Sequence, residues 1–109
     1  MPYAATYLPE APERAEVDAT PGLQLLEFGA NWCGHCQAAQ PAIQSALAAN
    51  PALAHRKVED GPGRLLGRSY RVKLWPTLIF LKDGQEVERL VRPTAAADVA
   101  AALARLTAV

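Results

Sequence analysis

The sequence reads Asn31-Trp32-Cys33-Gly34-His35-Cys36 at the stretch that decides its fold, and this stretch holds both cysteines of the chain. An apolar run over residues 23–28 leads into it. The apolar residues that follow, up to Leu47, recur at steps of three and four, as on one face of a helix. A strand, a sharp turn and a helix therefore surround the cysteines. In that setting the Cys-x-x-Cys spacing indicates a redox pair.

The position of the cysteines predicts a different task for each. Cys33 is expected in the first helical turn, where free backbone N–H groups and the helix dipole stabilise a thiolate. A thiolate is the form that attacks a disulfide, so Cys33 is the predicted nucleophile. Cys36 lies almost one turn deeper on the same face, within reach of Cys33 but shielded from solvent. We expect Cys33 to attack a substrate and Cys36 to resolve the mixed disulfide.

The composition is typical of a small soluble protein. The 109 residues suffice for one domain, and 50% of them are hydrophobic and 20% charged. The net charge of zero argues against nucleic acid or a membrane surface as the main partner. The sequence shows no signal-peptide pattern and no apolar stretch long enough to cross a bilayer. We expect a cytoplasmic monomer without a cofactor, although a periplasmic or secreted protein that had lost its signal would have the same composition.

The remaining pattern predicts an α/β fold. Residues 1–22 are expected to form an N-terminal arm with one short helix at 13–19, and residues 23–109 a single domain. Strands are predicted at 23–28, 53–59, 77–81 and 85–91, the last two joined by a hairpin. Helices are predicted after the cysteine motif, around residues 65–70, and from Pro93-Thr94 onward. A central mixed sheet of about four strands with helices on both faces is the economical packing.

Side-chain spacing gives three finer expectations. The short helix should carry an apolar stripe of Leu65, Leu66 and Tyr70, and a second face of Arg64, Arg68 and Arg71. The arginine face is a solvated surface or a docking patch for a partner. In the strand at 85–91, Arg89 falls on the same face as Val87 and Val91. The last helix should turn Val99, Leu103 and Leu106 inward.

These features resemble the thioredoxin family. The matches are Glu27-Phe28, Ala30, Trp32, Cys33-Gly34-His35-Cys36, Pro41 within the following helix, Trp75-Pro76-Thr77, Asp83-Gly84 at the hairpin, and the closing helix. They extend in order over about residues 23–107. The resemblance implies the thioredoxin fold and a thiol–disulfide oxidoreductase that acts on protein disulfides through Cys33. It also implies recycling by a thioredoxin-reductase-like or glutathione-based system.

Four positions depart from the family pattern. Gly34-His35 separates the cysteines, as in protein disulfide isomerase, where bacterial reductases usually carry Gly-Pro. Glu27 replaces the usual aspartate, Trp75 replaces a small or β-branched aliphatic residue, and Arg92-Pro93 stands where glycine is common. The His35 imidazolium is expected to stabilise the Cys33 thiolate, which makes the disulfide a better oxidant.

Glu27 is a candidate proton acceptor. It shares a strand face with Leu23 and Leu25, so we expect it to be buried and its pKa to be raised by desolvation. A buried carboxylate there can take the proton of Cys36 as that thiol resolves the mixed disulfide. Removing it is expected to stabilise the fold. The resemblance makes Lys57 a partner of this acid, and an ordinary surface lysine is the alternative.

The resemblance also places a substrate groove beside Cys33. Its expected walls are Trp32, Gly34, Trp75, Pro76 and the turn at Arg92, with Pro76 in the cis form. The Trp75 backbone would then pair with an extended substrate strand. Trp75 and Arg92 add bulk and positive charge, so we expect poor reduction of insulin and a preference for a specific, acidic partner. Core packing is the competing explanation of both tryptophans, above all of Trp32.

Other functions stay open for the cysteine pair. The chain can be a binding or chaperone-like module in which the pair is incidental. Zinc needs four ligands, and only His35 and His55 supplement the cysteines, so no metal site is predicted. An iron–sulfur cluster bridged between two chains is the remaining metal alternative.

Overall fold

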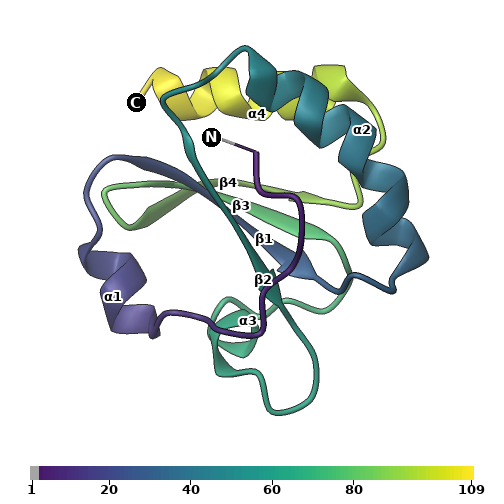
Figure 1. Cartoon of the computed structure of the whole chain (residues 1–109). Helices are drawn as coiled ribbons and strands as arrows, with labels where there is room; N and C mark the ends of the chain where they lie inside the picture. The colour runs from purple at the N-terminus through teal and green to yellow at the C-terminus, as the bar shows by residue number, and fades with distance from the viewer. Residues whose placement is uncertain (1–2) are drawn as a thin grey trace.

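A four-stranded mixed sheet forms the centre of the computed structural model, which describes residues 3–109 (Figure 1). The strands are β1 (Leu23–Gly29), β2 (Ala54–Glu59), β3 (Thr77–Lys82) and β4 (Gln85–Val91), in the spatial order β2-β1-β3-β4. β1 pairs parallel with β2 and antiparallel with β3, and β3 and β4 form the antiparallel hairpin. The mixed sheet and all four predicted strands are confirmed.

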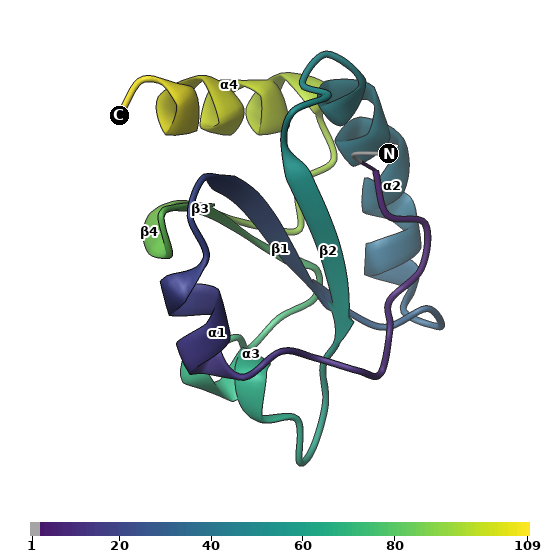
Figure 2. The same ribbon diagram turned by 60° about the vertical axis from the view of Figure 1, so that its left-hand side comes forward.

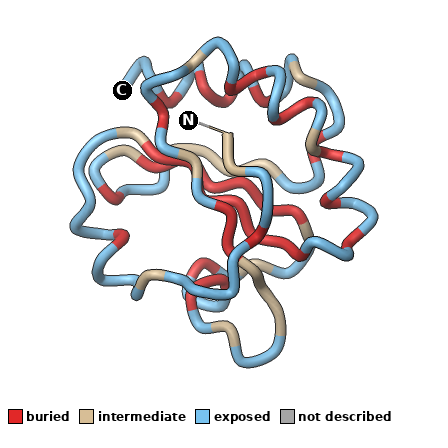
Figure 3. The backbone as a smooth tube through the Cα atoms, in the orientation of Figure 1, coloured by how far each residue is buried: buried red, intermediate tan, exposed pale blue. Residues whose placement is uncertain are grey.

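Helices cover both faces of this sheet (Figure 2). α2 (Gly34–Ala48) and α4 (Ala96–Thr107) pack on one face, and α1 (Arg14–Ala19) and α3 (Leu65–Ser69) on the other. Figure 3 shows the buried backbone concentrated in the strands and along the inward sides of the helices. Among residues 3–109, no helix has both the length and the apolar character that crossing a membrane requires.

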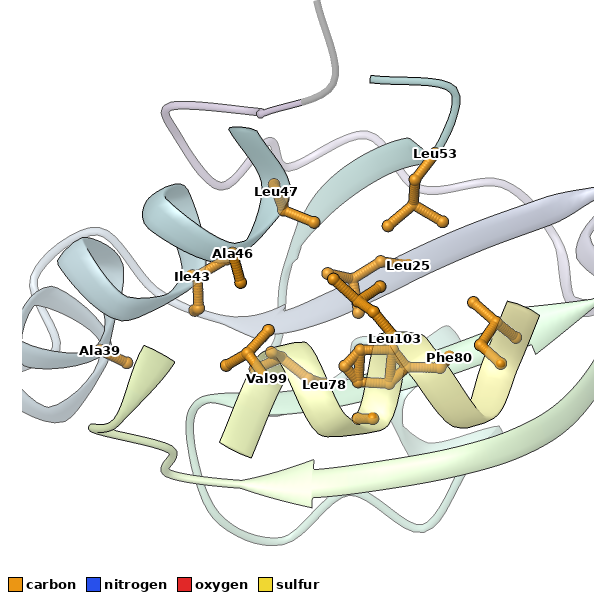
Figure 4. Close-up of a cluster of buried hydrophobic side chains, with 12 residues drawn as sticks. Leu25, Ala39, Ile43, Ala46, Leu47, Leu53, Leu78, Phe80, Val99 and Leu103 are labelled. Carbon is orange, nitrogen blue, oxygen red and sulfur yellow. The ribbon is translucent and has the colours of Figure 1, made fainter. Parts of the chain in front are cut away.

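β1 is buried on both faces because it lies between two strands and two layers of helices. Leu25 faces the core beneath α2 and α4, where it meets Ile43, Phe80 and Leu103 (Figure 4). Leu26 and Phe28 alternate with it and enter the second core, beneath α1 and α3. Glu27 therefore points to the same side as Leu25, toward α2. As predicted, Val99, Leu103 and Leu106 of α4 are buried, although that helix begins at Ala96, later than Thr94.

α3 is shorter than the sequence pattern suggests. Leu66 and Tyr70 are buried as expected, but Leu65 is 75% exposed, so the three do not form one stripe. The helix spans five residues, and Arg71 lies beyond it in the left-handed region with φ of 58°. Helical spacing therefore does not extend to Arg71. Arg64, Arg68 and Arg71 nevertheless line one surface hollow.

A β-bulge resets the alternation along β4. Phe80 pairs with Glu88 and Leu81 pairs with Glu86, which leaves Val87 without a counterpart on β3. As a result Val87 and Leu90 both pack against the core beneath α2 and α4. The expectation that Arg89 shares the face of Val87 is therefore wrong, because the bulge shifts the period between them.

The N-terminal arm is tied to the edge of the sheet. Leu8 forms a parallel bridge with Val58 of β2, in which the Leu8 N–H donates to the Lys57 carbonyl and the Glu59 N–H donates to the Leu8 carbonyl. Further along, the Arg14 guanidinium of α1 lies 3.8 Å from the centre of the Tyr70 ring. The short helix predicted at 13–19 is confirmed by α1.

Gly29 closes β1 where the side chains of Tyr7 and Cys36 meet. A Cβ added at Gly29 would lie 2.6 Å from Cys36 Sγ and 2.8 Å from Tyr7 Cζ, closer than unbonded atoms approach. We therefore expect Gly29→Ala to lower the free energy of unfolding by about 1–3 kcal/mol through overpacking. Urea denaturation of the reduced protein measures this loss.

Gly34→Ala is the matched control. A Cβ at Gly34 meets nothing within 4 Å, so we expect its stability to stay within about 0.5 kcal/mol of wild type. Equal stabilities of the two variants would contradict the steric argument.

Candidate active site

The two cysteines occupy the start of α2 as free thiols. Cys33 is the N-cap residue, and the backbone N–H of Cys36 donates to its sulfur over 3.3 Å. Cys33 is 8% exposed and Cys36 only 1%. The expected positions at the start of α2 are confirmed, and Cys36 is the more deeply buried of the two cysteines.

Cys36 needs a proton acceptor before it can act as a nucleophile. Burial raises its pKa to about 11, and its contact with Cys33 adds to the rise. At neutral pH it is therefore a thiol, and a thiol attacks disulfides poorly.

Glu27 is fully buried and accepts hydrogen bonds from three side chains. The Tyr7 hydroxyl and Gln40 Nε2, the latter at 2.9 Å, donate to Oε2, and His55 Nε2 lies 2.9 Å from Oε1. Burial alone would raise the pKa of Glu27, but these hydrogen bonds together lower it below its ordinary value. The expected burial is confirmed, whereas the expected upward shift is wrong because desolvation is outweighed by the donors.

The hydrogen bonds of His55 fix its protonation. The backbone N–H of Ala4 donates to Nδ1 over 2.8 Å, so Nδ1 carries no proton. The ring proton is therefore on Nε2, where it is donated to Glu27. His55 therefore faces Glu27 as a hydrogen-bond donor, and a further group that balances the negative charge of Glu27 lies nearby.

Lys57 supplies that balancing charge through Gln40. Its ammonium group is buried and donates to Gln40 Oε1 over 2.9 Å and to the Ala5 carbonyl over 3.1 Å. Gln40 passes the interaction on by donating to Glu27. Burial lowers the pKa of Lys57, and the charge of Glu27 opposes that shift. Lys57 is therefore a neighbour of the acid, as the resemblance implied, and the surface-lysine alternative is wrong.

Of the predicted groove residues, Trp32, Pro76 and Arg92 lie next to Trp75. Pro76 follows a cis peptide bond, as expected. Trp32 is 74% exposed, which contradicts core packing, and its ring meets that of Trp75 edge-on at 5.6 Å. Trp75 packs against the cysteine cluster, and its indole N–H donates to Asp60 over 2.9 Å. Gly34 and His35 are exposed at the start of α2.

Arg92 closes over the backbone that precedes Pro76. Its side-chain Nε donates to the Trp75 carbonyl over 2.8 Å, and its backbone N–H donates to the Pro76 carbonyl over 2.9 Å. Arg92 has φ of 54°, a conformation that favours glycine. The Arg92 side chain therefore occupies the Trp75 carbonyl, which belongs to the backbone where an extended substrate is expected to pair.

Three residues around Glu27 were not singled out as its partners from the sequence: Tyr7, Gln40 and His55. Gln40 follows Cys36 by four residues, so helical periodicity places it on the same face. His55 alternates with Lys57 on β2, and Lys57 is in register with Glu27, which places both on its face. For Tyr7 the sequence carries no such signal, because the arm has no clear periodicity. Among residues 3–109, no three His, Cys, Asp or Glu side chains gather closely enough to hold a metal ion.

Comparison with known proteins agrees with this geometry. The family model named Thioredoxin matches residues 7–105. A thioredoxin of Chlamydia trachomatis is 40% identical over 70 residues, which cover 64% of this chain and 69% of that protein. An H-type thioredoxin of Fagopyrum esculentum is 35% identical over 69 residues, which cover 63% of this chain and 60% of that protein.

A solved structure extends the similarity to nearly the whole chain. Reduced thioredoxin 2 from Pseudomonas aeruginosa superposes with a TM-score of 0.87 at 52% identity, covering 97% of this chain and 98% of that one. The family match includes part of the arm, beyond the residues 23–107 that carried the resemblance. With its paired Cys33 and Cys36 and this match over most of its length, the chain belongs to the thioredoxin family of thiol–disulfide oxidoreductases.

Proposed function

We propose that this protein exchanges disulfides with protein substrates through a mixed disulfide on Cys33, which Cys36 resolves. The observation that carries the proposal is the contrast at the start of α2: the Cys33 sulfur accepts a helical N–H, whereas Cys36 is buried as a thiol. A helix N-terminus is a position that stabilises a thiolate, and Cys33 is the more exposed of the two cysteines.

The proposed cycle has two exchanges. The Cys33 thiolate attacks one sulfur of the substrate disulfide, and the other substrate sulfur leaves as a thiolate and takes up a proton. Cys36 then attacks the Cys33 sulfur, its proton moves toward Glu27, and the second substrate sulfur leaves. The lowered pKa makes Glu27 a weak base, so it holds the proton only until the more basic substrate thiolate takes it. The resulting Cys33–Cys36 disulfide is reduced again by a thioredoxin-reductase-like or glutathione-based system.

We propose that His35 adjusts the reduction potential of the Cys33–Cys36 pair. Its exposed imidazole stands one helical position after Gly34, and as an imidazolium it would stabilise the Cys33 thiolate and make the disulfide more oxidising. Both cysteines of the chain belong to this motif, which suits a compartment that keeps thiols reduced. A cytoplasmic location is part of the proposal.

The substrate range follows from Arg92. Extended substrates bind by pairing with exposed backbone, and Arg92 already uses the Trp75 carbonyl. Trp75 also lines a hollow of about 610 Å³, where Arg64, Arg68, Arg71 and Lys73 outnumber the acidic residue Asp60. These positive charges favour an acidic partner over a general substrate.

Insulin reduction with dithiothreitol tests the proposed function. We expect Cys33→Ser to abolish the catalysed rate, because the attacking thiolate is gone, and Cys36→Ser to accumulate a covalent complex on Cys33. Brief iodoacetamide treatment should label Cys33 before Cys36 in the reduced native protein. A Cys33→Ser variant as active as wild type would leave only the binding-module alternative.

Acid titration tests the charge of Glu27. Its folded pKa lies below the ordinary value of 4.5, so its contribution to stability is present above that pH and is lost as the pH falls through the folded pKa. We expect Glu27→Gln to be less stable than wild type by about 1–3 kcal/mol at neutral pH, because the amide opposes a buried donor. This reverses the expectation that removing the group stabilises the fold.

Urea denaturation between neutral pH and pH values below 4.5 measures the effect. The difference between the two proteins should shrink as the solution is acidified. A constant difference, or a more stable variant at neutral pH, would show that the hydrogen bonds do not outweigh burial.

Arg92→Gly tests whether the hydrogen bond from Arg92 to the Trp75 carbonyl restricts substrate binding. If one hydrogen bond of about 1 kcal/mol has to break before a substrate binds, the variant should reduce insulin about fivefold faster. Arg71→Gly is the matched control, since it removes the same charge at a position with a similarly positive φ but leaves the Trp75 carbonyl covered. Equal rates for the two variants would exclude the carbonyl as the restriction.

A further inference from the structure

The arm brings Tyr7 to the active site and holds it there from both sides. The Tyr7 N–H donates to Asn31 Oδ1 over 2.8 Å, and Asn31 Nδ2 donates back to the Tyr7 carbonyl over 3.1 Å. The next residue, Leu8, is fixed to β2 by its bridge with Val58. Figure 2 shows the arm passing alongside α2 and β2 before it reaches α1. Because Asn31 opens the active-site stretch, the arm and the cysteine motif are positioned together.

The Tyr7 side chain lies between Cys36 and Glu27. It is 4% exposed, and its hydroxyl donates to Glu27 Oε2. The same hydroxyl and the Cys36 sulfur converge above Gly29, where a Cβ would lie 2.9 Å from the Tyr7 oxygen and 2.6 Å from the sulfur. The hydroxyl and the thiol therefore both border the space that the missing side chain of Gly29 leaves open. Both residues belong to one buried cluster, and the interaction between the two groups contributes to the pKa shift of each.

We propose that the Tyr7 hydroxyl relays the Cys36 proton to Glu27 when Cys36 attacks the mixed disulfide. The inference deepens the proposed function and rests on it. The Tyr7 oxygen takes the proton from the Cys36 sulfur while its own proton moves to Glu27 Oε2. In the same step the Cys36–Cys33 bond forms, the bond between Cys33 and the substrate sulfur breaks, and the substrate leaves as a thiolate. The substrate disulfide is the oxidant, and no other reactant is required.

A hydroxyl suits this task because it donates and accepts at once. Burial, followed by the charge of Glu27, raises the pKa of Tyr7 far above neutral pH, so the residue stays protonated before and after the transfer. Tyr7 therefore conducts a proton without holding a charge. Lys57 lies 4.4 Å from the centre of the Tyr7 ring and donates to Gln40, which in turn donates to Glu27, so the charge of Lys57 favours the ionised carboxylate.

Water is the rival carrier. A small pocket of about 80 Å³ beside Cys36 is lined by Tyr7, Gln40 and Lys57, among others. Because about 10–15 Å³ of such space suffices for one water, the pocket has room for water. If such a water took the proton of Cys36, the Tyr7 hydroxyl would be dispensable, and this difference makes the proposal testable.

Tyr7→Phe removes the hydroxyl and keeps the ring. With the reduced protein and dithionitrobenzoate, the first thionitrobenzoate released reports attack by Cys33 and the second reports resolution by Cys36. General acid–base catalysis typically contributes 10²–10⁴-fold, so even with partial replacement by water we expect the second phase to slow by about tenfold or more. The first phase should stay within about twofold of wild type, because Cys33 does not use this relay.

Tyr3→Phe is the matched control. Tyr3 also belongs to the arm, but its hydroxyl donates to Gln40 Oε1 rather than to Glu27, so both phases should resemble wild type. As the pH rises toward about 11, Cys36 ionises without an acceptor and the second phases of wild type and Tyr7→Phe should converge. Glu27, His55, Lys57 and Tyr3 face the same site in both proteins. Because Tyr7→Phe also removes a hydrogen bond that lowers the pKa of Glu27, the two rates are compared only well above pH 4.5.

Two results would overturn the relay: a second phase of Tyr7→Phe within about twofold of wild type, or equal slowing of both phases. Either result leaves the proposed function intact, because that function requires only that wild type shows both phases and that Cys33→Ser shows neither. If Tyr7→Phe fails to fold, a proton inventory on wild type decides instead. Two protons moving in one step give a curved dependence of the second phase on deuterium content, and a straight line contradicts the relay.

Discussion

The burial of the Glu27 carboxylate is the constraint on which the rest of the site depends. An uncompensated charge in a protein interior costs several kcal/mol, so its partners have to be present in the folded state. They come from separate parts of the chain: Tyr7 from the arm, Gln40 from α2, and His55 with Lys57 from β2. The arm, α2 and the sheet edge therefore have to assemble together. Both the fold and the active site therefore depend on these partners being placed around the charge of Glu27.

This arrangement keeps an acid and a thiol in opposite protonation states at the same pH. Glu27 stays ionised because donors surround it, and Cys36 stays protonated because burial disfavours its thiolate. Neither group changes state until a sulfur–sulfur bond begins to form. Oxidation of the Cys36 thiol in the absence of a substrate is disfavoured, since the thiolate is the reactive form.

Much of the fold could be predicted from the sequence because its signals are local. The apolar run of β1, the helical spacing after Cys36 and the hairpin at Asp83-Gly84 depend only on neighbouring residues. The burial of Glu27 followed from the alternation with Leu25. The bulge that turns Val87 inward depends instead on pairing between strands, and the exposure of Leu65 depends on where α3 stops.

The cysteine pair and the buried acid beside it could be predicted from the sequence, but the direction of the pKa shift of that acid could not. The spacing of Cys33 and Cys36 in the sequence indicates a redox pair. The pKa of Glu27, in contrast, is set by hydrogen-bond donors that lie far away in the sequence. Tyr7 is 20 residues from Glu27, and His55 is 28 residues from it. A rule based on burial alone predicts a raised pKa for Glu27. The pKa is lowered instead, because the shift depends on how many hydrogen-bond donors the folded chain brings to the carboxylate.

The reciprocal hydrogen bonds between Tyr7 and Asn31 hold the N-terminal arm against the active-site stretch. Residues 3–8 behave as a tethered ligand that completes an otherwise unfinished pocket, held at the high effective concentration that a covalent link provides. Such a segment can in principle be detached and supplied as a separate peptide. The affinity of such a peptide would report on the sum of its contacts, which include the bonds of Tyr3 to Gln40, of Ala4 to His55 and of Tyr7 to Glu27.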